Sequence, residues 1–370
     1  MGIKEIHISK FKPSLKLAED IYSSLGGILY RKGTTLKEKD NEILKAFGVL
    51  KFKIEEGKLI NKIEERDNKE CQSTDDEEKP NEAQHDKKIT LFQREFHQGT
   101  VTIDKLLKAA RGKTDVSILE LREAIQPLID KLNTDPKQLL TINSSLFKLE
   151  QYQSYHSLFV GLMSYLLAKW LELDKNEWMP IALAGVLHDI GMSRVPDQIT
   201  FNKGKLNHYE LAEIKKHPVY GYEILKETIG LNKGTLLAVL QHHEREDGSG
   251  YPLKLKKEQI HNYAKIIAIA DVFHAMISRR TYRSGYTIFN TLEHLLREGY
   301  QKLDMKYVHI LVQKISQFTL SEKVRLNDGR QGVVMFIDQH YPTKPWVKVG
   351  NDIINLINEK TIFIKEIEII

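Results

Sequence analysis

The chain has 370 residues, of which 41% are hydrophobic and 28% are charged. This composition is typical of globular proteins and excludes a collagen-like or wholly disordered chain. The net charge of +5 is small for this length, and the sequence contains no long basic run, so we do not expect binding to a DNA or RNA duplex. At roughly 100–200 residues per domain, we expect two or three domains.

Cysteine content and hydropathy indicate the compartment. The single cysteine, Cys71, excludes a disulfide framework and is typical of a reducing compartment. The first sixteen residues lack the apolar segment of a signal peptide. The most apolar stretch, residues 158–171, is interrupted by Lys169 and is too short to span a bilayer. We therefore expect a cytoplasmic protein without membrane insertion.

The first quarter of the chain divides into a small module and a linker. Residues 1–60 contain two alternating, strand-like runs at 3–8 and 49–55, with one helical pattern at about 36–47, which predicts a small α+β module. In residues 61–88, ten acidic and six basic side chains make up sixteen of 28 positions. Such a segment buries too little apolar surface to offset its ordering entropy. We predict a flexible linker, with a solvated helix as the alternative.

The rest of the chain changes from helical to strand patterning. Residues 89–320 carry apolar side chains at helical spacing, with Pro and Gly at the breaks, and predict a helical domain. Residues 321–370 contain two strand-like runs around Asn327-Asp328-Gly329, a strong hairpin signal, and predict a small β module. The expected fold is mainly α, a helical bundle flanked by these two small modules.

Several histidines and aspartates of the helical domain follow apolar runs. His188-Asp189 follows IALAGVL, His242-His243 follows TLLAVLQ, and Asp271 follows IIAIA. A His or Asp at the inner end of a buried helix is costly unless it is paired, hydrogen-bonded or bound to a metal. Any one of these could be an ordinary core histidine, but together they favour one shared site for Fe, Mn or Zn.

These residues resemble the signature of the HD-GYP domain, a subclass of the HD phosphohydrolases. The resemblance is carried by His188-Asp189-Ile-Gly, His217-Pro218, the run HHEREDGSGYP at 242–252, Asp271, and Arg280-Thr-Tyr-Arg283. It covers roughly residues 140–320 and implies an HD-type helical bundle with a two-metal, sometimes three-metal, iron or manganese site. It also implies hydrolysis of cyclic di-GMP to pGpG, and often on to GMP, by a hydroxide that two metals activate.

The resemblance assigns roles to individual residues. The positions that match its metal ligands are His156, His188, Asp189, His217, His242, His243 and Asp271, with Asp189 also a catalytic, bridging carboxylate. The positions that match the substrate-binding loop are Gly250, Tyr251 and Pro252, and those that match the phosphate-binding arginines are Arg280 and Arg283. The alternative for the two arginines is an exposed helix end.

Three positions depart from the pattern of the family. Met192 stands where the family commonly has a lysine facing the scissile phosphate, and a methionine cannot take that role. Tyr152 stands where three-metal members have a glutamate, which favours two metals. His274 replaces an aspartate one helical turn after Asp271. It could supply a proton in catalysis, act as an extra ligand, or be a packed core histidine.

Three functions remain open from the sequence. The first is a metal-dependent phosphodiesterase for cyclic di-GMP, supported by the complete ligand set. The second is a cyclic di-GMP sensor or adaptor with weak or lost catalysis, supported by Met192 and the flanking modules. The third is a phosphodiesterase for another cyclic dinucleotide, because fold alone does not determine the substrate. The resemblance also implies a possible homodimer.

Overall fold

A computed structural model of the chain describes residues 2–22, 28–38, 40–46, 49–56, 90–112, 116–142, 151–200, 204–278 and 287–368. The chain divides into two units, Met1–His85 and Asp86–Ile370. The predicted linker at 61–88 lies outside the described residues.

The N-terminal unit is a small α+β module. Strand β1 (Gly2–His7) pairs antiparallel with β4 (Lys51–Glu56), and β2 (Ile21–Tyr22) pairs with β3 (Ile28–Tyr30). The 3₁₀ turn η1 (Ile8–Lys10) and helix α1 (Asp40–Ala46) complete it. The largest fully buried side chains of this unit are Leu17, Leu29, Leu36 and Leu44.

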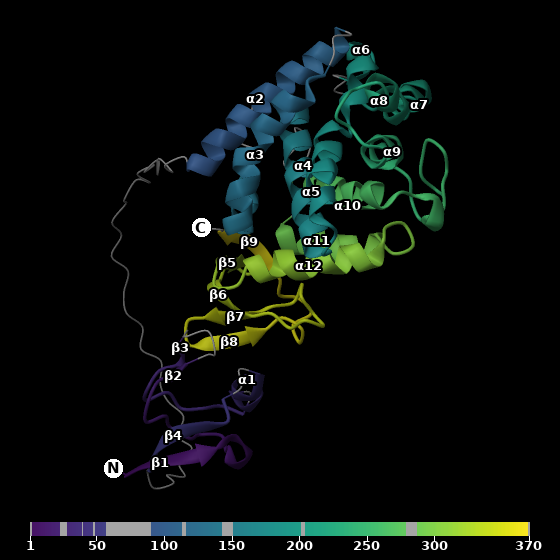
Figure 1. The fold of residues 1–370 in the computed structure, drawn as a ribbon. Coiled ribbons are helices and arrows are strands. Elements are labelled where there is room, and N and C mark those ends of the chain that lie inside the picture. Colours follow the sequence, from purple (N-terminus) through teal and green to yellow (C-terminus); the bar gives the residue numbers. More distant parts are fainter. Residues whose placement is uncertain are drawn as a thin grey trace, which may run out of the picture. The chain divides into compact units, whose positions relative to one another are not determined.

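The larger unit begins with a helical domain (Figure 1). Its long helices are α2 (Leu91–Arg111), α3 (Ile118–Thr134), α4 (Tyr152–Trp170), α5 (Lys175–Leu187), α10 (Asn262–Ile277), α11 (Ile288–Glu298) and α12 (Met305–Phe318). Shorter helices are α6 (Asp197–Thr200), α7 (His208–Ile214), α8 (His217–Leu225) and α9 (Lys233–Gln241). The 3₁₀ turns are η2 (Pro136–Thr141), η5 (Ile190–Arg194) and η6 (Lys257–Gln259).

Helix α4 is the centre of this domain. Every residue from Ser154 to Ala168 is buried, as expected for a helix that is apolar all round and has neighbours on every side. It packs most extensively on α5, and also on α2 and α10. The closest approach is at two glycines: a Cβ on Gly185 would lie 2.7 Å from the Cα of Gly161. Only glycine allows the two backbones to pass this closely, and this crossing fixes α4 and α5 relative to one another.

A five-stranded antiparallel sheet follows the helices. Its strands are β5 (Lys323–Leu326), β6 (Gln331–Phe336), β7 (Trp346–Val349), β8 (Asp352–Asn355) and β9 (Ile364–Glu368), in the order β8-β7-β6-β5-β9. The predicted hairpin is β5–β6, and Gly329 in its turn has a φ of +89°. Phe289 of α11 packs into the core of the sheet, and Lys344 pairs with Glu293 of α11 at 2.7 Å. The sheet therefore packs on the helical domain.

In the part of the chain that the structure describes, we find no helix that is both long and apolar enough to cross a membrane.

Candidate metal centre

The helix packing brings the predicted ligands together from five segments of the chain. His156 lies in α4 and Asp271 in α10, while His217 is the first residue of α8. His188 and His242 are the residues that end α5 and α9. The imidazoles of His156, His188, His217 and His242 are all buried, as expected for polar groups that converge at the inner ends of helices.

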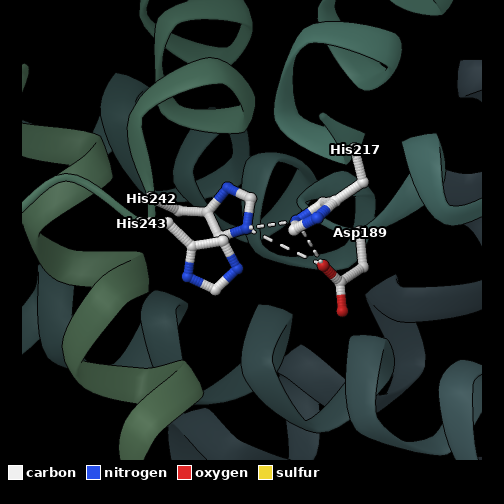
Figure 2. Close-up of side chains that lie close together, drawn as sticks. All are labelled: Asp189, His217, His242 and His243. Atoms are coloured by element: carbon white, nitrogen blue, oxygen red, sulfur yellow. Dashed lines mark hydrogen bonds and ion pairs between the residues drawn. The ribbon is translucent and has the colours of Figure 1, made fainter. Parts of the chain in front are cut away.

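Asp189 lies at the centre of the cluster. Its Oδ1 is 3.1 Å from Nε2 of His217 and 3.7 Å from Nε2 of His242, and its Oδ2 is 3.3 Å from Nε2 of His188. Figure 2 shows the side chains of His217, His242 and Asp189 pointing toward one another, with the ring of His243 beside them. Both oxygens of one carboxylate thus face different imidazoles, which is the arrangement that a bridging ligand requires.

Backbone contacts fix the tautomer of three imidazoles. Each donates its Nδ1–H to the carbonyl three residues earlier: His188 to Gly185 (2.7 Å), His217 to Ile214 (2.8 Å) and His242 to Val239 (2.8 Å). A carbonyl only accepts, so the neutral rings present their Nε2 lone pairs to the centre of the site. The Nε2 atoms of His217 and His242 are only 3.2 Å apart. Two facing lone pairs repel one another unless a proton or a cation lies between them.

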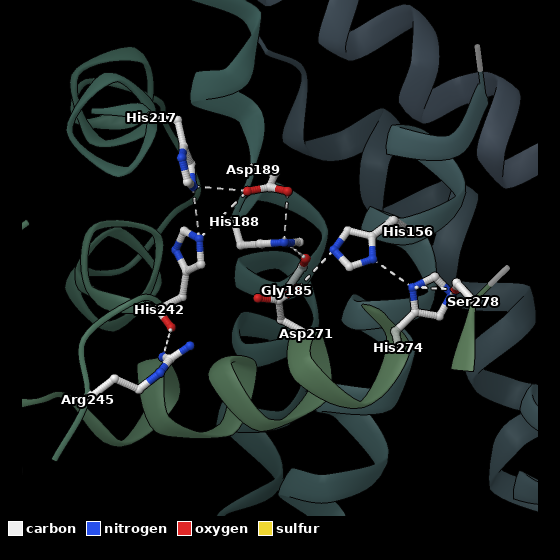
Figure 3. Close-up of polar contacts among 10 residues, drawn as sticks. All are labelled: His156, Gly185, His188, Asp189, His217, His242, Arg245, Asp271, His274 and Ser278. Atoms are coloured by element: carbon white, nitrogen blue, oxygen red, sulfur yellow. Dashed lines mark hydrogen bonds and ion pairs between the residues drawn. The ribbon is translucent and has the colours of Figure 1, made fainter. Parts of the chain in front are cut away.

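The other end of the cluster joins α4 to α10. Nε2 of His156 is 3.1 Å from Oδ1 of Asp271, and its Nδ1 is 2.7 Å from Nδ1 of His274. Figure 3 shows His274 and Ser278 on the side of His156 that faces away from Asp189. His274 therefore contacts the predicted ligand His156 at Nδ1, the ring nitrogen that does not face Asp271.

The donor set fits a metal centre. One group contains Asp189, His217, His242 and His243, and a second contains His156, His188 and Asp189; within each group the ligand atoms lie within 4.8 Å of one another. The two groups share Asp189 alone. Nε2 of His188 is buried and makes no hydrogen bond to any described residue, although Asp189 is near. A buried nitrogen without such a partner is costly, and a cation would satisfy it.

In the metal-free protein, the pKa shifts favour charged carboxylates at Asp189 and Asp271, neutral imidazoles at His242 and His243, and a protonated His188. Burial lowers the pKa of His242 to about 4, and burial together with His242 lowers the pKa of His243 well below its usual value. Burial opposes ionisation of Asp189 and Asp271, but the neighbouring histidines outweigh it and lower both carboxyl pKa values. Burial also opposes the charge on His188, yet Asp189 outweighs it and raises the pKa of His188 to about 9. Without a cation, His188 thus carries the balancing proton.

The predicted substrate loop lies against the cluster. A Cβ on Gly250 would lie 2.5 Å from backbone atoms of residues 243–245, so only glycine fits this position. The ring of Tyr251 stacks on His243 with centroids 4.6 Å apart, and Nζ of Lys215 lies 5.5 Å from the Tyr251 centroid. Pro252 follows through a cis peptide bond and is half-buried. The loop therefore contacts the cluster directly through Tyr251.

The other positions that the sequence singled out have fewer described contacts with the ligand cluster. Met192 lies half-buried in η5, three residues after Asp189, and its backbone N–H donates to the Asp189 carbonyl. The ring of Tyr152 stacks on His156 with an interplanar angle of 11°. Arg280 and Arg283 lie outside the described residues.

Two charged residues of the signature run have contacts that sequence reasoning did not anticipate. Glu244 is buried, and its carboxylate accepts the backbone N–H groups of Leu253 (2.6 Å) and Leu255 (2.9 Å). Arg245 donates to the carbonyls of His242 (3.2 Å) and Glu244 (2.9 Å). The sequence shows a charged pair directly after two adjacent histidines, but the partners of this pair depend on how the loop closes nine residues later. Together these contacts hold the substrate loop against the paired histidines.

Comparisons with known proteins agree with this geometry. Residues 130–307 match the family model described as HD domain. The chain is 33% identical over 217 residues to the cyclic di-GMP phosphodiesterase PA4108 of Pseudomonas aeruginosa, covering 58% of this chain and 51% of that protein. It is 34% identical over 198 residues to the cyclic di-GMP phosphodiesterase response regulator RpfG of Xanthomonas campestris, covering 52% of each. It is 31% identical to the 3'3'-cGAMP-specific phosphodiesterase 2 of Vibrio cholerae, covering 53% of this chain and 38% of that protein.

A solved structure supports the fold. Bd1817 of Bdellovibrio bacteriovorus, described as a HDG"Y"P protein, aligns with a TM-score of 0.50 and 14% identity over 84% of this chain and 98% of that one. The helical part of the chain, which includes the matched residues 130–307, is thus similar to an HD domain, and its His and Asp side chains form two groups that could hold a metal ion. With its paired histidines and GYP loop, this part of the chain resembles the HD-GYP family. The chain spans about half the length of the curated relatives it matches.

Proposed function

We propose that this protein is a metal-dependent phosphodiesterase that hydrolyses cyclic di-GMP to pGpG, with hydrolysis of pGpG to GMP as a candidate second step. The observation that carries the proposal is the pair of ligand groups that share Asp189. Relatives that are named cyclic di-GMP phosphodiesterases are 33% and 34% identical to this chain over 58% and 52% of its length. The cyclic dinucleotide is the substrate class that these relatives have in common.

We propose two divalent cations per chain, iron or manganese, one in each ligand group. Imidazole and carboxylate ligands suit both metals. When bound, two such cations supply the charge that stabilises the attacking and leaving oxygens of an in-line displacement. Tyr152 offers a phenol where a third metal would need a carboxylate, so two cations fit these residues better than three.

Side chains of the protein orient the metal ligands and are proposed to bind the substrate. Asp189 holds the two halves of the site at a fixed separation, and the backbone carbonyls behind His188, His217 and His242 fix their ring orientation. Tyr251 offers an aromatic face beside His243, on which a guanine base could stack. Arg280 and Arg283 stay predicted phosphate contacts, since an arginine fork suits a phosphodiester oxygen pair. The homodimer and the cytoplasmic location also stay predictions.

Two observations support the other candidate functions. The relative named for 3'3'-cGAMP supports a hybrid cyclic dinucleotide as substrate. Met192, in place of a basic residue, supports weak catalysis and a sensor role, because methionine carries no charge to place on the phosphate.

A turnover assay decides among these candidates. The purified chain, loaded anaerobically with Mn²⁺ or Fe²⁺, is incubated separately with cyclic di-GMP and 3'3'-cGAMP, and the products are separated by chromatography. We expect cyclic di-GMP to give pGpG in more than one turnover. Binding of cyclic di-GMP without any product would instead support the sensor, and preferential cleavage of 3'3'-cGAMP would support the hybrid substrate.

A further inference from the structure

His274 occupies the position behind one of the proposed ligands. It lies on α10, is fully buried, and packs against the rings of Phe159 (4.2 Å between centroids) and Tyr155 (4.9 Å). Its Nδ1 is 2.7 Å from Nδ1 of His156, which is a short hydrogen-bonding distance. We propose that His274 is a positioning residue, which sets the tautomer of His156. It thereby controls cation binding by the ligand group that contains His156, His188 and Asp189. The proposal rests on the metal site of the proposed function.

Only one of the two facing Nδ1 atoms can carry the shared hydrogen. In the first arrangement, His156 donates through Nδ1 and keeps a lone pair on Nε2, while Nε2–H of His274 donates to Oγ of Ser278 at 3.0 Å. In the second, His274 donates through Nδ1, and Nε2–H of His156 donates to Oδ1 of Asp271 at 3.1 Å. Each ring carries one proton in both arrangements, and the Ser278 hydroxyl can accept or donate. Both arrangements therefore satisfy the contacts among His156, His274 and Ser278, but only the second gives Asp271 a proton from His156.

A cation selects between the two arrangements. In the first, the Nε2 lone pair of His156 faces the Asp271 carboxylate, which is repulsive unless a cation binds both. In the second, that same nitrogen is blocked by a proton. The first arrangement thus belongs to the loaded site and the second to the empty one, and the pair exchanges them without any net gain or loss of protons.

The other ligands lack this freedom. His188, His217 and His242 each face a backbone carbonyl, which accepts only and keeps their tautomers fixed. His156 is the one among these four whose partner can also donate. Loss of the His274 acceptor should therefore affect the cation near His156 and Asp271 and spare the cation held by His217 and His242.

Mn²⁺ binding to the full chain, without substrate, tests this selectivity. The metal-stripped protein is titrated with Mn²⁺, and free Mn²⁺ is measured by its electron paramagnetic resonance signal. His274→Leu should lower the affinity for one of two Mn²⁺ ions 10- to 100-fold and leave the affinity for the other unchanged. A loss of this size is usual when the hydrogen-bond partner of a metal ligand is removed. His274→Asp, which restores an acceptor without a donor, should recover most of the lost affinity. His309→Leu is the control, because His309 is an exposed histidine of α12 that contacts only its own helix among the described residues.

The outcomes separate this inference from the proposed function. Unchanged binding of both ions by His274→Leu would overturn it. So would equal loss of both ions without rescue by His274→Asp, because that pattern indicates a purely structural role. Wild-type protein that binds no Mn²⁺ would overturn the metal site and this inference together, whereas failure to cleave a cyclic dinucleotide would leave the binding result standing.

A second measurement does not depend on the folding of the His274 variants. In ¹⁵N-histidine-labelled wild-type protein loaded with Zn²⁺, the nitrogen shifts distinguish the two tautomers, and His156→Gln assigns the His156 signals. We expect a protonated Nδ1 on His156. An Nδ1 of His156 without a proton in the loaded protein would contradict the inference.

Discussion

Replacement of Asp189 by asparagine removes one negative charge from the centre of the cluster and keeps the shape of the side chain. In the metal-free protein, Asp189 is the main cause of the raised pKa of His188, about 9 against an ordinary 6.5. A shift of this size corresponds to roughly 3 kcal/mol of stability, at about 1.4 kcal/mol per pKa unit. We expect Asp189→Asn to destabilise the metal-free protein by about this amount, because His188 would then lie buried without its counter-charge.

The pH dependence of this effect follows from its sign. A group with a raised folded-state pKa contributes its full stability below the unfolded-state pKa, here 6.5, and loses it as the pH rises through about 9. The difference in free energy of unfolding between wild type and Asp189→Asn should therefore be greatest below pH 6.5, about 2–3 kcal/mol at pH 7, and small above pH 9.5.

The assay is urea unfolding of chelator-treated protein, followed by circular dichroism at several pH values, with metal content measured in parallel on untreated protein. Asp189→Asn should lose most of both metals, since both ligand groups use Asp189. Asp197→Asn is the matched control: Asp197 is exposed and pairs with Arg111, and such surface pairs contribute at most about 1 kcal/mol. Two tightly bound metals in Asp189→Asn, or a stability difference that does not change with pH, would refute this reasoning.

Three further predictions concern other parts of the site. Met192→Lys should raise turnover of cyclic di-GMP more than it changes binding, because a positioned cation or acid typically adds 10²–10⁴-fold to the rate; equal kcat values in wild type and variant would count against a role for this position. Arg280→Ala and Arg283→Ala should each weaken dinucleotide binding by about 1.5–3 kcal/mol, measured by calorimetry, and leave metal content unchanged; unaltered affinity in both would identify them as an ordinary helix end. His242 has its pKa lowered to about 4 by burial, so the metal-free protein should lose roughly 3 kcal/mol of stability as the pH falls from 6.5 to 4. His242→Gln should reduce this loss of stability between pH 6.5 and pH 4. An unchanged loss in the variant would mean that other groups cause it.

Much of the fold follows from sequence patterns that depend on local structure. The helical domain and the β5–β6 hairpin lie where periodicity and turn residues predicted them. The ends of α5 and α9 coincide with the ends of apolar runs, so His188 and His242 could be recognised as polar groups at the inner ends of helices. The helix predicted at about 36–47 spans Asp40–Ala46 in the structure, and Leu36, which contributed to the apolar pattern, is buried before the helix begins.

The geometry of the site could not be derived from such patterns. That Asp189 faces three imidazoles from three segments depends on how α5, α8 and α9 pack, and a Cβ at position 191 or 221 would disturb that packing. A close contact between two glycines has no signature in a single sequence. The contacts of Glu244 likewise appear only when the loop after it is closed.

His274 illustrates the limit of helical spacing. Its position three residues after Asp271 indicated the same face of α10, and therefore the same site. Three steps of 100° leave the two side chains about 60° apart around the helix axis. That rotation is enough for Asp271 to face Nε2 of His156 while His274 faces Nδ1 of the same ring. Spacing alone identifies the face of the helix, but it does not distinguish a group in front of a ligand from one behind it.

Charge balance connects the proposed metal pair to the proposed substrate. The ligand set contains two carboxylates, Asp189 and Asp271, and its imidazoles are neutral when they bind metal. Two divalent cations would then leave the buried site with two excess positive charges, and uncompensated charge is costly there. The two phosphodiester groups of a cyclic dinucleotide carry two negative charges and would neutralise this excess. Met192 leaves the balance unchanged, whereas a lysine at this position would add a third positive charge. The methionine therefore weakens the electrostatic attraction to the phosphates of both substrate and product. The changes in kcat and KM caused by Met192→Lys measure how much this attraction affects turnover and binding.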